Sequence, residues 1–542
     1  MEILGSRFTM LNLAHKMLAL STMNANKRFL KIAGVLFLIN LAFLGTLNAQ
    51  KITYSEPERE DNRRTNFEII GRIGGNILIF KNNKNDNDIS VYDANMKLID
   101  RVKQTDLDER WINVDFIPYP DHAWMIYQYQ RKSVVHCMAV KIDSKGKRIT
   151  EPVELDTTRI GWSANNKIYT TLFSDDKGSI MVFKVNSKNP NNFFFTTMLF
   201  NNKLELIKKD RMTLPMEERN DNFTDFLLDN EGTLVFCKYI RRNGSETISS
   251  AFVVTKKSSD DAFRVRNVKP DTDRLLDEIK LKVDNTNKRY FITALYYKQR
   301  RGNIEGLYTV VWDKAMDTII RKTELPFSDE MRKIAKGPDA NIKMAFDDYY
   351  ITNIITRRDG GYIVVSEAMY TSSRGNAYNR WDYRYGNSPW SSPIDNYYWS
   401  PYSSYYNNSW NSPYNRWGTS SGATRFHSEN IVVMSFTKDG NLEWNSTIPK
   451  SQYDDDNDGL ISHQMMITGG ELQLFYNSYE RRTLLLHNES IAPDGKVSRH
   501  PTLKNLDREI DFMPRYGKQV SARALVLPCM NRNSLTFAKI EY

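Results

Sequence analysis

The sequence repeats one unit along most of its length: an alternating apolar run, a tight polar turn and a second alternating run. The clearest copy is IVVMSFTKDGNLEWNSTIPK at residues 431–450, whose turn contains Asp439 and Gly440. Asp-Gly between two such runs predicts a β-hairpin, because glycine readily adopts the positive φ that these turns require. Further copies occur at residues 88–103, 137–155, 307–325 and 484–503. This repetition predicts an all-β chain made of small antiparallel units.

Two kinds of hairpin alternate along the chain. One kind is the unit above, and the other joins a turn to a strongly apolar strand, as in residues 67–81 and 463–478. A hairpin of each kind gives a four-stranded module, and the modules begin near residues 66, 113, 159, 222, 278, 347 and 461. The C-terminus then supplies only three strands, whereas residues 51–57 supply one strand ahead of the first module. Pairing these strands predicts an eighth module and removes an open sheet edge.

Four-stranded modules at this period resemble the blades of a β-propeller. We therefore predict an all-β fold over residues 51–542, a seven- or eight-bladed β-propeller closed by its N- and C-terminal strands. The sequence SFTKDGNLEW resembles the blade motif of quinoprotein-type propellers, and three Gly-Gly pairs resemble those of kelch-type repeats, although they fall at a different turn. Only Trp444 carries the tryptophan of the quinoprotein motif, so we predict no quinone cofactor. Tandem β-sandwiches are the alternative architecture.

The first fifty residues predict export. Lys27, Arg28 and Lys31 precede an apolar run that ends in Asn48-Ala49-Gln50. A basic start, a short apolar stretch and alanine at the cleavage position are typical of a secretory signal peptide. The run is shorter than the ~20 apolar residues of a membrane span. We assign residues 1–49 to an upstream extension plus signal peptide, with an uncleaved anchor as the alternative.

The end of this segment resembles secreted proteins of Gram-negative bacteria. We therefore expect an exported protein that is periplasmic, associated with the outer membrane or extracellular, with no membrane span in the mature chain. Cys137, Cys237 and Cys529 each lie inside an apolar run. In an exported chain this predicts three buried free thiols rather than a disulfide framework. The formal charge of +10 is spread along the strands, so we do not expect nucleic acid as a partner.

One segment breaks the strand pattern, at residues 371–428. It is dominated by Tyr, Ser, Asn, Trp, Pro and Arg and lacks Leu and Val, so it has too few aliphatic residues for a core of its own. We predict a low-complexity insertion between the second and third strands of the sixth module. Tyr and Trp supply large contact areas at low entropic cost. The predicted binding residues are therefore its tryptophans, Trp381, Trp390, Trp399, Trp410 and Trp417. A surface insertion without function is the alternative.

In a propeller, the connection between the second and third strands shares a face with the connections between blades. The insertion would then lie beside the acidic stretch YDDDNDG at residues 453–459 and beside three loops that carry an acid-Arg pair. The arginines of these loops, Arg110, Arg219 and Arg508, complete the set of predicted binding residues.

The acidic stretch resembles the opening of a calcium-binding loop. Asp454, Asp456 and Asp458 alternate before Gly459, and carboxylates at positions one, three and five of such a loop surround the cation. Met465 stands where position twelve should be glutamate. A weak Ca²⁺ site is one interpretation and a solvated polar turn is the other. No other cofactor is predicted.

Local catalytic motifs are absent from the sequence, including His-Glu-x-x-His, Cys-x-x-Cys and Gly-x-Ser-x-Gly. We therefore predict no catalytic residues. The expected function is a non-catalytic secreted interaction or scaffold module of the cell envelope that binds a protein or glycan through one face. The alternative is a glycan-active propeller enzyme, a hydrolase or lyase, whose carboxylates come from separate blades and meet in the central channel.

Overall fold

The computed structural model describes residues 50–542, except for 60–64, 84–85, 106–109, 162–166, 190–191, 216–220, 242–246, 301, 337–340, 374–423, 456–458, 481–482, 504–509 and 532–533. The compact unit Ile52–Glu541 is all-β, as the sequence predicts. Among the described residues, no helix combines the length and the apolar character of a membrane span.

The strands form small antiparallel sheets in which sequence neighbours pair. The first three sheets are β3–β6 (Thr65–Ile73, Asn76–Asn83, Asp86–Tyr92, Leu98–Lys103), β7–β10 (Arg110–Pro118, His122–Arg131, Val134–Asp143, Val153–Arg159) and β11–β14 (Tyr169–Phe173, Ser179–Asn189, Asn192–Asn201, Leu206–Pro215). The next two groups are β15–β18 (Asp221–Leu228, Leu234–Arg241, Ile248–Lys256, Arg264–Asn267) and β19–β22 (Leu275–Asp284, Arg289–Tyr297, Ile304–Asp313, Thr318–Pro326). These two groups are joined into one sheet by the pairing of Ile248 with Leu276.

The remaining strands continue this pattern. They are β23–β27 (Tyr349–Thr356, Tyr362–Ser373, Thr424–Phe436, Leu442–Ile448, Gln452–Asp454), β28–β31 (His463–Ile467, Leu472–Glu480, Thr483–Ile491, Val497–Arg499) and β32–β35 (Asp511–Phe512, Lys518–Ser521, Ala524–Asn531, Ser534–Glu541). The third module begins at Tyr169 rather than near residue 159, because residues 153–159 form the last strand of the preceding sheet. The sequence SDEMRKIAK at residues 328–336 predicts a helix, which is present as α2 (Asp329–Lys336). The Ser328 hydroxyl accepts a hydrogen bond from the Met331 amide at its first turn.

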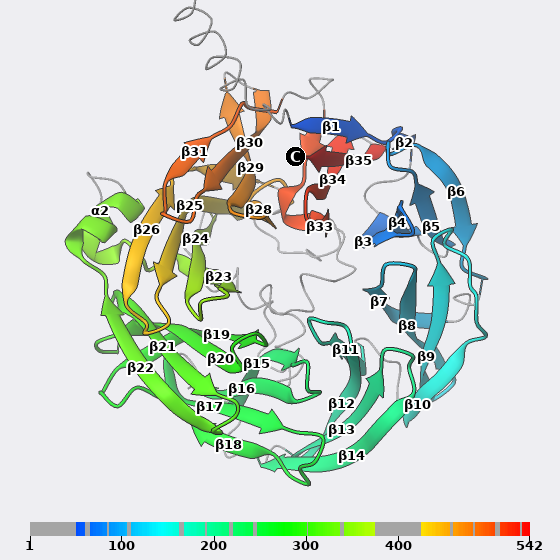
Figure 1. Ribbon diagram of the computed structural model, residues 1–542, viewed down its shortest axis with the longest axis horizontal. Coiled ribbons are helices and arrows are strands. Elements are labelled where there is room, and N and C mark those ends of the chain that lie inside the picture. The colour runs from blue at the N-terminus through cyan, green and yellow to red at the C-terminus, as the bar shows by residue number, and fades with distance from the viewer. Residues whose placement is uncertain are drawn as a thin grey trace, which may run out of the picture. The chain divides into compact units, whose positions relative to one another are not determined.

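The first strands of the unit pair with the last one, as predicted. The short strands β1 (Lys51–Tyr54) and β2 (Glu58–Arg59) both join the sheet through β35. Between them the Ser55 amide donates to the Phe537 carbonyl at 2.8 Å, and the Phe537 amide donates to Ser55 Oγ at 3.0 Å. The result is a β-propeller-like arrangement in which β3, β7, β11, β15, β19, β23, β28 and β33 lie nearest the centre of the unit (Figure 1).

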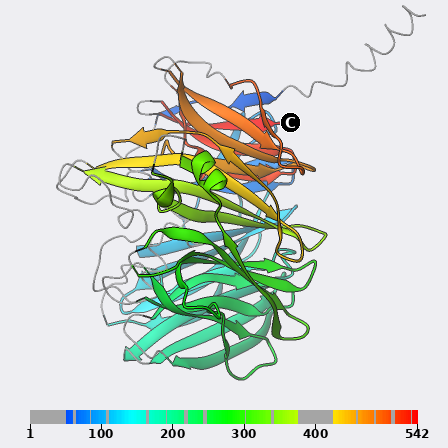
Figure 2. The same ribbon diagram turned by 90° about the vertical axis from the view of Figure 1, so that its left-hand side faces the viewer.

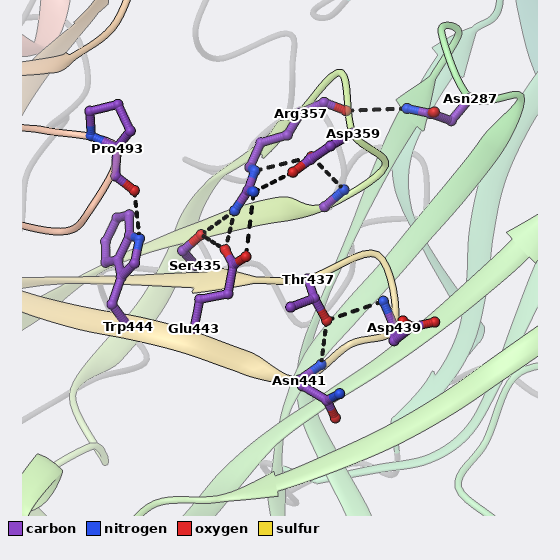
Figure 3. A network of polar contacts seen from close by, with 11 residues as sticks. Asn287, Arg357, Asp359, Ser435, Thr437, Asp439, Asn441, Glu443, Trp444 and Pro493 are labelled. Atoms are coloured by element: carbon purple, nitrogen blue, oxygen red, sulfur yellow. Dashed lines mark hydrogen bonds and ion pairs between the residues drawn. The ribbon is translucent and has the colours of Figure 1, made fainter.

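The repeated hairpin forms the joint between neighbouring sheets (Figure 3). Thr437 Oγ1 accepts hydrogen bonds from the Asp439 and Asn441 amides at 3.2 Å, which closes the turn between β25 and β26. From β26, Trp444 Nε1 donates to the Pro493 carbonyl of the next sheet at 2.9 Å. Gly495 follows with φ of 85°, and a Cβ at this position would lie 2.7 Å from the Trp444 ring. The turn glycine therefore lets one module pack directly on the indole of the module before it.

The core lies between adjacent sheets rather than in one central layer. Clusters of buried side chains join β4, β5, β8 and β9, and others join β24, β25, β29 and β30. The three cysteines are free and buried in separate strands, which confirms the prediction from their apolar surroundings.

Candidate functional site

Most of the predicted site residues lie outside the described part of the chain. This holds for the five tryptophans of the insertion, for Arg219 and Arg508, and for Asp456 and Asp458. Arg110 begins β7, where only its backbone is described. Asp454 is described at the end of β27. The assignments of these residues to binding and to Ca²⁺ remain predictions, and the described residues contain no group of three or more His, Cys, Asp or Glu side chains placed to hold a metal.

The strands that flank residues 374–423 are long and pair to their ends. β24 ends at Ser373 and β25 begins at Thr424, and these two residues are partners in the ladder. In Figure 2 the end of β24 projects on one side of the unit. β27 adds to the same stretch of β25, where Asp454 pairs with Phe426 and Tyr453 pairs with His427. The beginning of the acidic stretch therefore lies beside the strand that follows the insertion.

An exposed ion pair joins β25 to the residue after β27. Arg425 donates to both carboxylate oxygens of Asp455, at 2.5 and 3.1 Å. The guanidinium also lies 4.5 Å from the ring centroid of Tyr453, which is within the range of a cation–π contact. The hydrogen bond from Arg425 lowers the pKa of Asp455. We name the surface formed by Arg425, Tyr453, Asp455 and Tyr479 the rim.

A cleft of about 230 Å³ opens at the rim between β27 and β29. Tyr453 and Tyr479 line it and are 50% and 60% exposed, whereas Asn477 on its floor is 1% exposed. The Asn477 side-chain amide donates to the Leu460 and Phe512 carbonyls at 2.8 and 2.7 Å. Its Oδ1 has no hydrogen-bond partner among the described residues. An acceptor without a partner costs free energy until it is paired, which makes the cleft that Asn477 lines a candidate binding site.

The electrostatics of the cleft are acidic. Asp454 and Asp455 line it, and Asp511 lies close by. Burial raises the pKa of Asp511, and the neighbouring Asp454 raises it further. Burial and the same two carboxylates raise the pKa of Tyr479, so its hydroxyl stays protonated and can donate. The cleft therefore offers aromatic faces, hydroxyl donors and carboxylate acceptors within one small volume.

Two carboxyl groups on inner strands are relevant to the alternative hypothesis, that the protein is a glycan-active enzyme. Glu68 on β3 is buried, and burial raises its pKa to about 8 although the charge of Lys518 opposes this. Asp115 on β7 is close enough to raise the same pKa. Glu68 Oε2 and Asp115 Oδ2 have no hydrogen-bond partner among the described residues. At neutral pH Glu68 is a proton donor beside a second carboxyl group.

Sequence reasoning located the acidic stretch but missed Arg425, Asn477 and Tyr479. The local sequence around each of these residues is typical of a strand. Each residue is distinguished only by its contacts with other strands, which the sequence does not show. One signal was available, because LQLFYNSYE at residues 472–480 carries polar and aromatic residues beyond its apolar half. When the apolar residues of a strand end before the strand does, the remaining polar and aromatic residues are candidates for a surface site.

The chain has no match among known protein families, and no curated protein matches its sequence. Several solved structures are similar to parts of the chain at low identity and low TM-score. An ulvan lyase, described as a polysaccharide lyase bound to -[GlcA(1-4)Rha3S]-, is 10% identical with a TM-score of 0.35 and covers 79% of this chain and 93% of its own. An uncharacterized protein from Listeria monocytogenes is 8% identical with a TM-score of 0.34, covering 72% of this chain and 82% of its own.

Prolyl oligopeptidase B from Galerina marginata is 8% identical with a TM-score of 0.38. The match covers 89% of this chain but 55% of that enzyme, so the present chain spans about half of the enzyme's length.

Proposed function

We propose that the chain is an exported, eight-bladed propeller that acts as a non-catalytic binding module of the cell envelope and takes a glycan at the rim. The count of eight treats β15–β18 and β19–β22 as separate blades, which are joined by one residue pair. The observation that supports glycan binding is the rim cleft with its two exposed tyrosines over the unpartnered Asn477 Oδ1.

The chemistry of the cleft fits a sugar. Tyrosine rings offer an apolar face on which the C–H face of a sugar ring can pack, and each ring carries a polar hydroxyl. Carboxylate and amide oxygens accept hydrogen bonds from sugar hydroxyls, and the buried Asn477 Oδ1 gains most from doing so. A volume of about 230 Å³ is below the usual range for drug-sized ligands, which favours one sugar unit over a longer segment.

The test is glycan binding by the full chain and by Tyr479→Ala and Tyr453→Ala. We expect both variants to bind envelope polysaccharides about tenfold more weakly, because each removes a ring from the cleft. Met316→Ala is the matched control, since Met316 is 63% exposed on a turn away from the rim. Unchanged binding by both tyrosine variants would refute the rim as the glycan site.

Removal of residues 374–423 separates the contribution of the insertion from that of the cleft. Joining Ser373 to Thr424 with a short Gly-containing turn keeps the ladder between β24 and β25. Loss of capture of an envelope protein, with glycan binding retained, would assign protein binding to the insertion. Equal capture with and without the insertion would remove it from the proposed function.

A glycan-active enzyme is the second candidate, and Glu68 is the observation that favours it. A carboxylic acid with a pKa of about 8 beside Asp115 is suited to protonate a leaving oxygen at neutral pH. A screen for new reducing ends and for unsaturated products from polysaccharides would test this. Turnover that is lost in Glu68→Gln would establish the enzyme, and no turnover of any polysaccharide would reject it.

Export is part of the proposal and rests on the sequence of residues 1–49. Fractionation of cells that produce the full chain, with N-terminal sequencing of the exported product, tests it. A mature N-terminus at Gln50 is expected, and retention in the cytoplasm would refute export.

A further inference from the structure

A second cavity, which we name the inner cavity, lies among the inner strands. It has a volume of about 260 Å³ and is formed by β19, β23, β24, β28 and the segment that precedes β33. No residue lines both this cavity and the rim cleft. The polar side chains that line it are Lys280, Thr352, Asn353, Glu367, Ser462, His463, Gln464 and Arg515.

A fully buried ion pair stands behind one wall of the inner cavity. Lys450 Nζ lies 2.7 Å from Glu367 Oε1, and both side chains are 0% exposed. The Ser428 and Ser462 hydroxyls donate to the two oxygens of Glu367 at 2.7 and 2.6 Å. Burial alone would raise the pKa of Glu367, but Lys450 and His463 lower it well below its usual range. Glu367 therefore stays ionised and neutralises Lys450.

This network positions His463 at the cavity wall. His463 Nδ1 lies 3.1 Å from Glu367 Oε2, close enough for an ion pair although not aligned for a hydrogen bond. The preceding residue, Ser462, has φ of 71°, a left-handed conformation that is uncommon for serine. Its amide donates to Gln452 Oε1 at 2.9 Å while its hydroxyl is held by Glu367. Such strain persists only where surrounding contacts impose it, and it concentrates at functional sites.

The charges around the inner cavity favour an anion. Lys280 and Arg515 line it, while the charge of Glu367 is already matched by Lys450. Glu278, two residues before Lys280, accepts a hydrogen bond from the Ile351 amide at 2.9 Å. Two cationic side chains, Lys280 and Arg515, therefore line the cavity. A ligand carboxylate would meet two donors that form strong, charge-assisted hydrogen bonds.

The other lining groups define the rest of the ligand. Thr352 supplies a hydroxyl, and Asn353 and Gln464 supply amides, which are the partners of ligand hydroxyl groups. Met369 and Met465 supply adaptable apolar surface. An inorganic anion would leave the amides and methionines unused, whereas a sugar ring with a carboxylate uses all three kinds of group.

We propose that the inner cavity binds a sugar acid, with Lys280 and Arg515 at the carboxylate and Thr352, Asn353 and Gln464 at the hydroxyls. The cavity is slightly below the usual size for drug-like ligands, so it accommodates a single sugar-acid unit. This site is distinct from the rim, and the proposal does not depend on glycan binding at the rim.

Calorimetric titration of the full chain with D-glucuronate, D-glucose and acetate tests the proposal. We expect glucuronate to bind and both glucose and acetate to bind at least about tenfold more weakly, because each lacks one half of the recognised chemistry. Equal binding of glucose would refute recognition of the carboxylate, and equal binding of acetate would refute recognition of the hydroxyls. Absence of glucuronate binding to the wild-type chain would overturn the proposal outright.

Variants locate the bound ligand. Arg515→Met and Lys280→Met are expected to weaken glucuronate binding about tenfold or more. The matched control is Arg321→Met, which removes a 43% exposed cation on the outer strand β22. Thr352→Val, a milder change, is expected to weaken glucuronate binding and to lower the thermal midpoint slightly, because it also removes the 3.1 Å hydrogen bond from Thr352 Oγ1 to the Val365 carbonyl. Tyr479→Ala distinguishes the two sites: loss of glucuronate binding in this variant, with binding retained in Arg515→Met, would move the sugar acid to the rim and overturn the inner site.

Discussion

Two ion pairs at one boundary between sheets differ in burial and therefore in their role in this protein. Both involve β25 or its immediate partners, where Ser428 contacts the buried Glu367–Lys450 pair and Arg425 forms the rim pair with Asp455. The side chains of the buried pair are 0% exposed, whereas those of the rim pair are 46% and 61% exposed. A few residues along one strand separate an interior charge pair from one in solvent.

The difference in burial between the two pairs distinguishes charges that determine structure from charges that remain available for ligands. A buried pair must satisfy every donor and acceptor, because each unmatched charge is costly there. It therefore fixes Ser428, Ser462 and His463 in place. A solvated pair stabilises little because water and salt screen it. The rim can consequently exchange Arg425 or Asp455 contacts for ligand contacts at low cost, while the interior network has to stay as it is.

The largest expected effect is from Glu367→Gln. This variant keeps the shape of the side chain but leaves Lys450 buried without a counter-charge, which should cost about 3–5 kcal/mol of unfolding free energy. Urea unfolding followed by circular dichroism measures it. A loss below about 1 kcal/mol would contradict the interior role of this pair.

The double variant Glu367→Met/Lys450→Met sharpens the same comparison. Removing both charges also removes the unmatched one, so part of the stability lost in Glu367→Gln should return. A double variant less stable than Glu367→Gln would show that the hydrogen bonds from Ser428 and Ser462 matter more than the charges.

At the other end of the same boundary, Gly495→Val should cost about 1–3 kcal/mol of unfolding free energy. Valine is strained at the positive φ of this turn, and its Cβ would meet the Trp444 ring at 2.7 Å. Gly470→Ala is the control, since a Cβ there meets no atom within 4 Å. A change in the tryptophan fluorescence of Gly495→Val but not of Gly470→Ala would place the disturbance at the indole.

Acid should weaken the buried pair gradually. The pKa of Glu367 is lower in the folded chain than in the unfolded one, so its contribution is complete above the unfolded pKa of about 4.3 and is lost as the pH falls below it. One such group changes stability by at most ~1.4 kcal/mol per pH unit. The wild-type chain should therefore lose stability more steeply below pH ~4.3 than Glu367→Gln does. Parallel pH profiles of the two proteins would contradict this assignment.

The smallest expected effect is from Asp455→Asn at the rim. The Asp455 side chain is largely exposed, so the thermal midpoint should stay within experimental error although the pKa of Asp455 is lowered by Arg425. Asp455→Asn and Glu367→Gln both replace a carboxylate with an amide, the first in solvent and the second in the interior. A fall in midpoint as large as that of Glu367→Gln would remove the distinction between the two regions.

Much of the fold was predictable from the sequence, because turn chemistry and strand alternation are local signals. The Asp439-Gly440 turn, the helix at Asp329–Lys336 and the pairing of the first strands with the last one all follow from such signals and from counting strands. The boundary near residue 159 was wrong because Val153–Arg159, a short and mostly polar strand, pairs with the preceding sheet.

The sites were much harder to predict. Glu367 and Lys450 are 83 positions apart, and His463 is on the next sheet, so only the register across β24, β25 and β28 brings them together. Nothing in the local sequence distinguishes Glu367 from a solvated glutamate at the end of an apolar strand. The acidic stretch was visible because its residues are adjacent, whereas its partners Arg425 and Tyr479 come from separate strands.

The pairing of Ser55 with Phe537 spans 482 positions of the chain. A contact of that span forms late in folding, since closing so long a loop carries a large entropic penalty. Until it forms, β35 presents an unpaired ladder of backbone donors and acceptors to any neighbouring chain. Loss of the few residues around Ser55 would therefore leave nearly every module intact and still expose the edge of β35 to pairing with another chain.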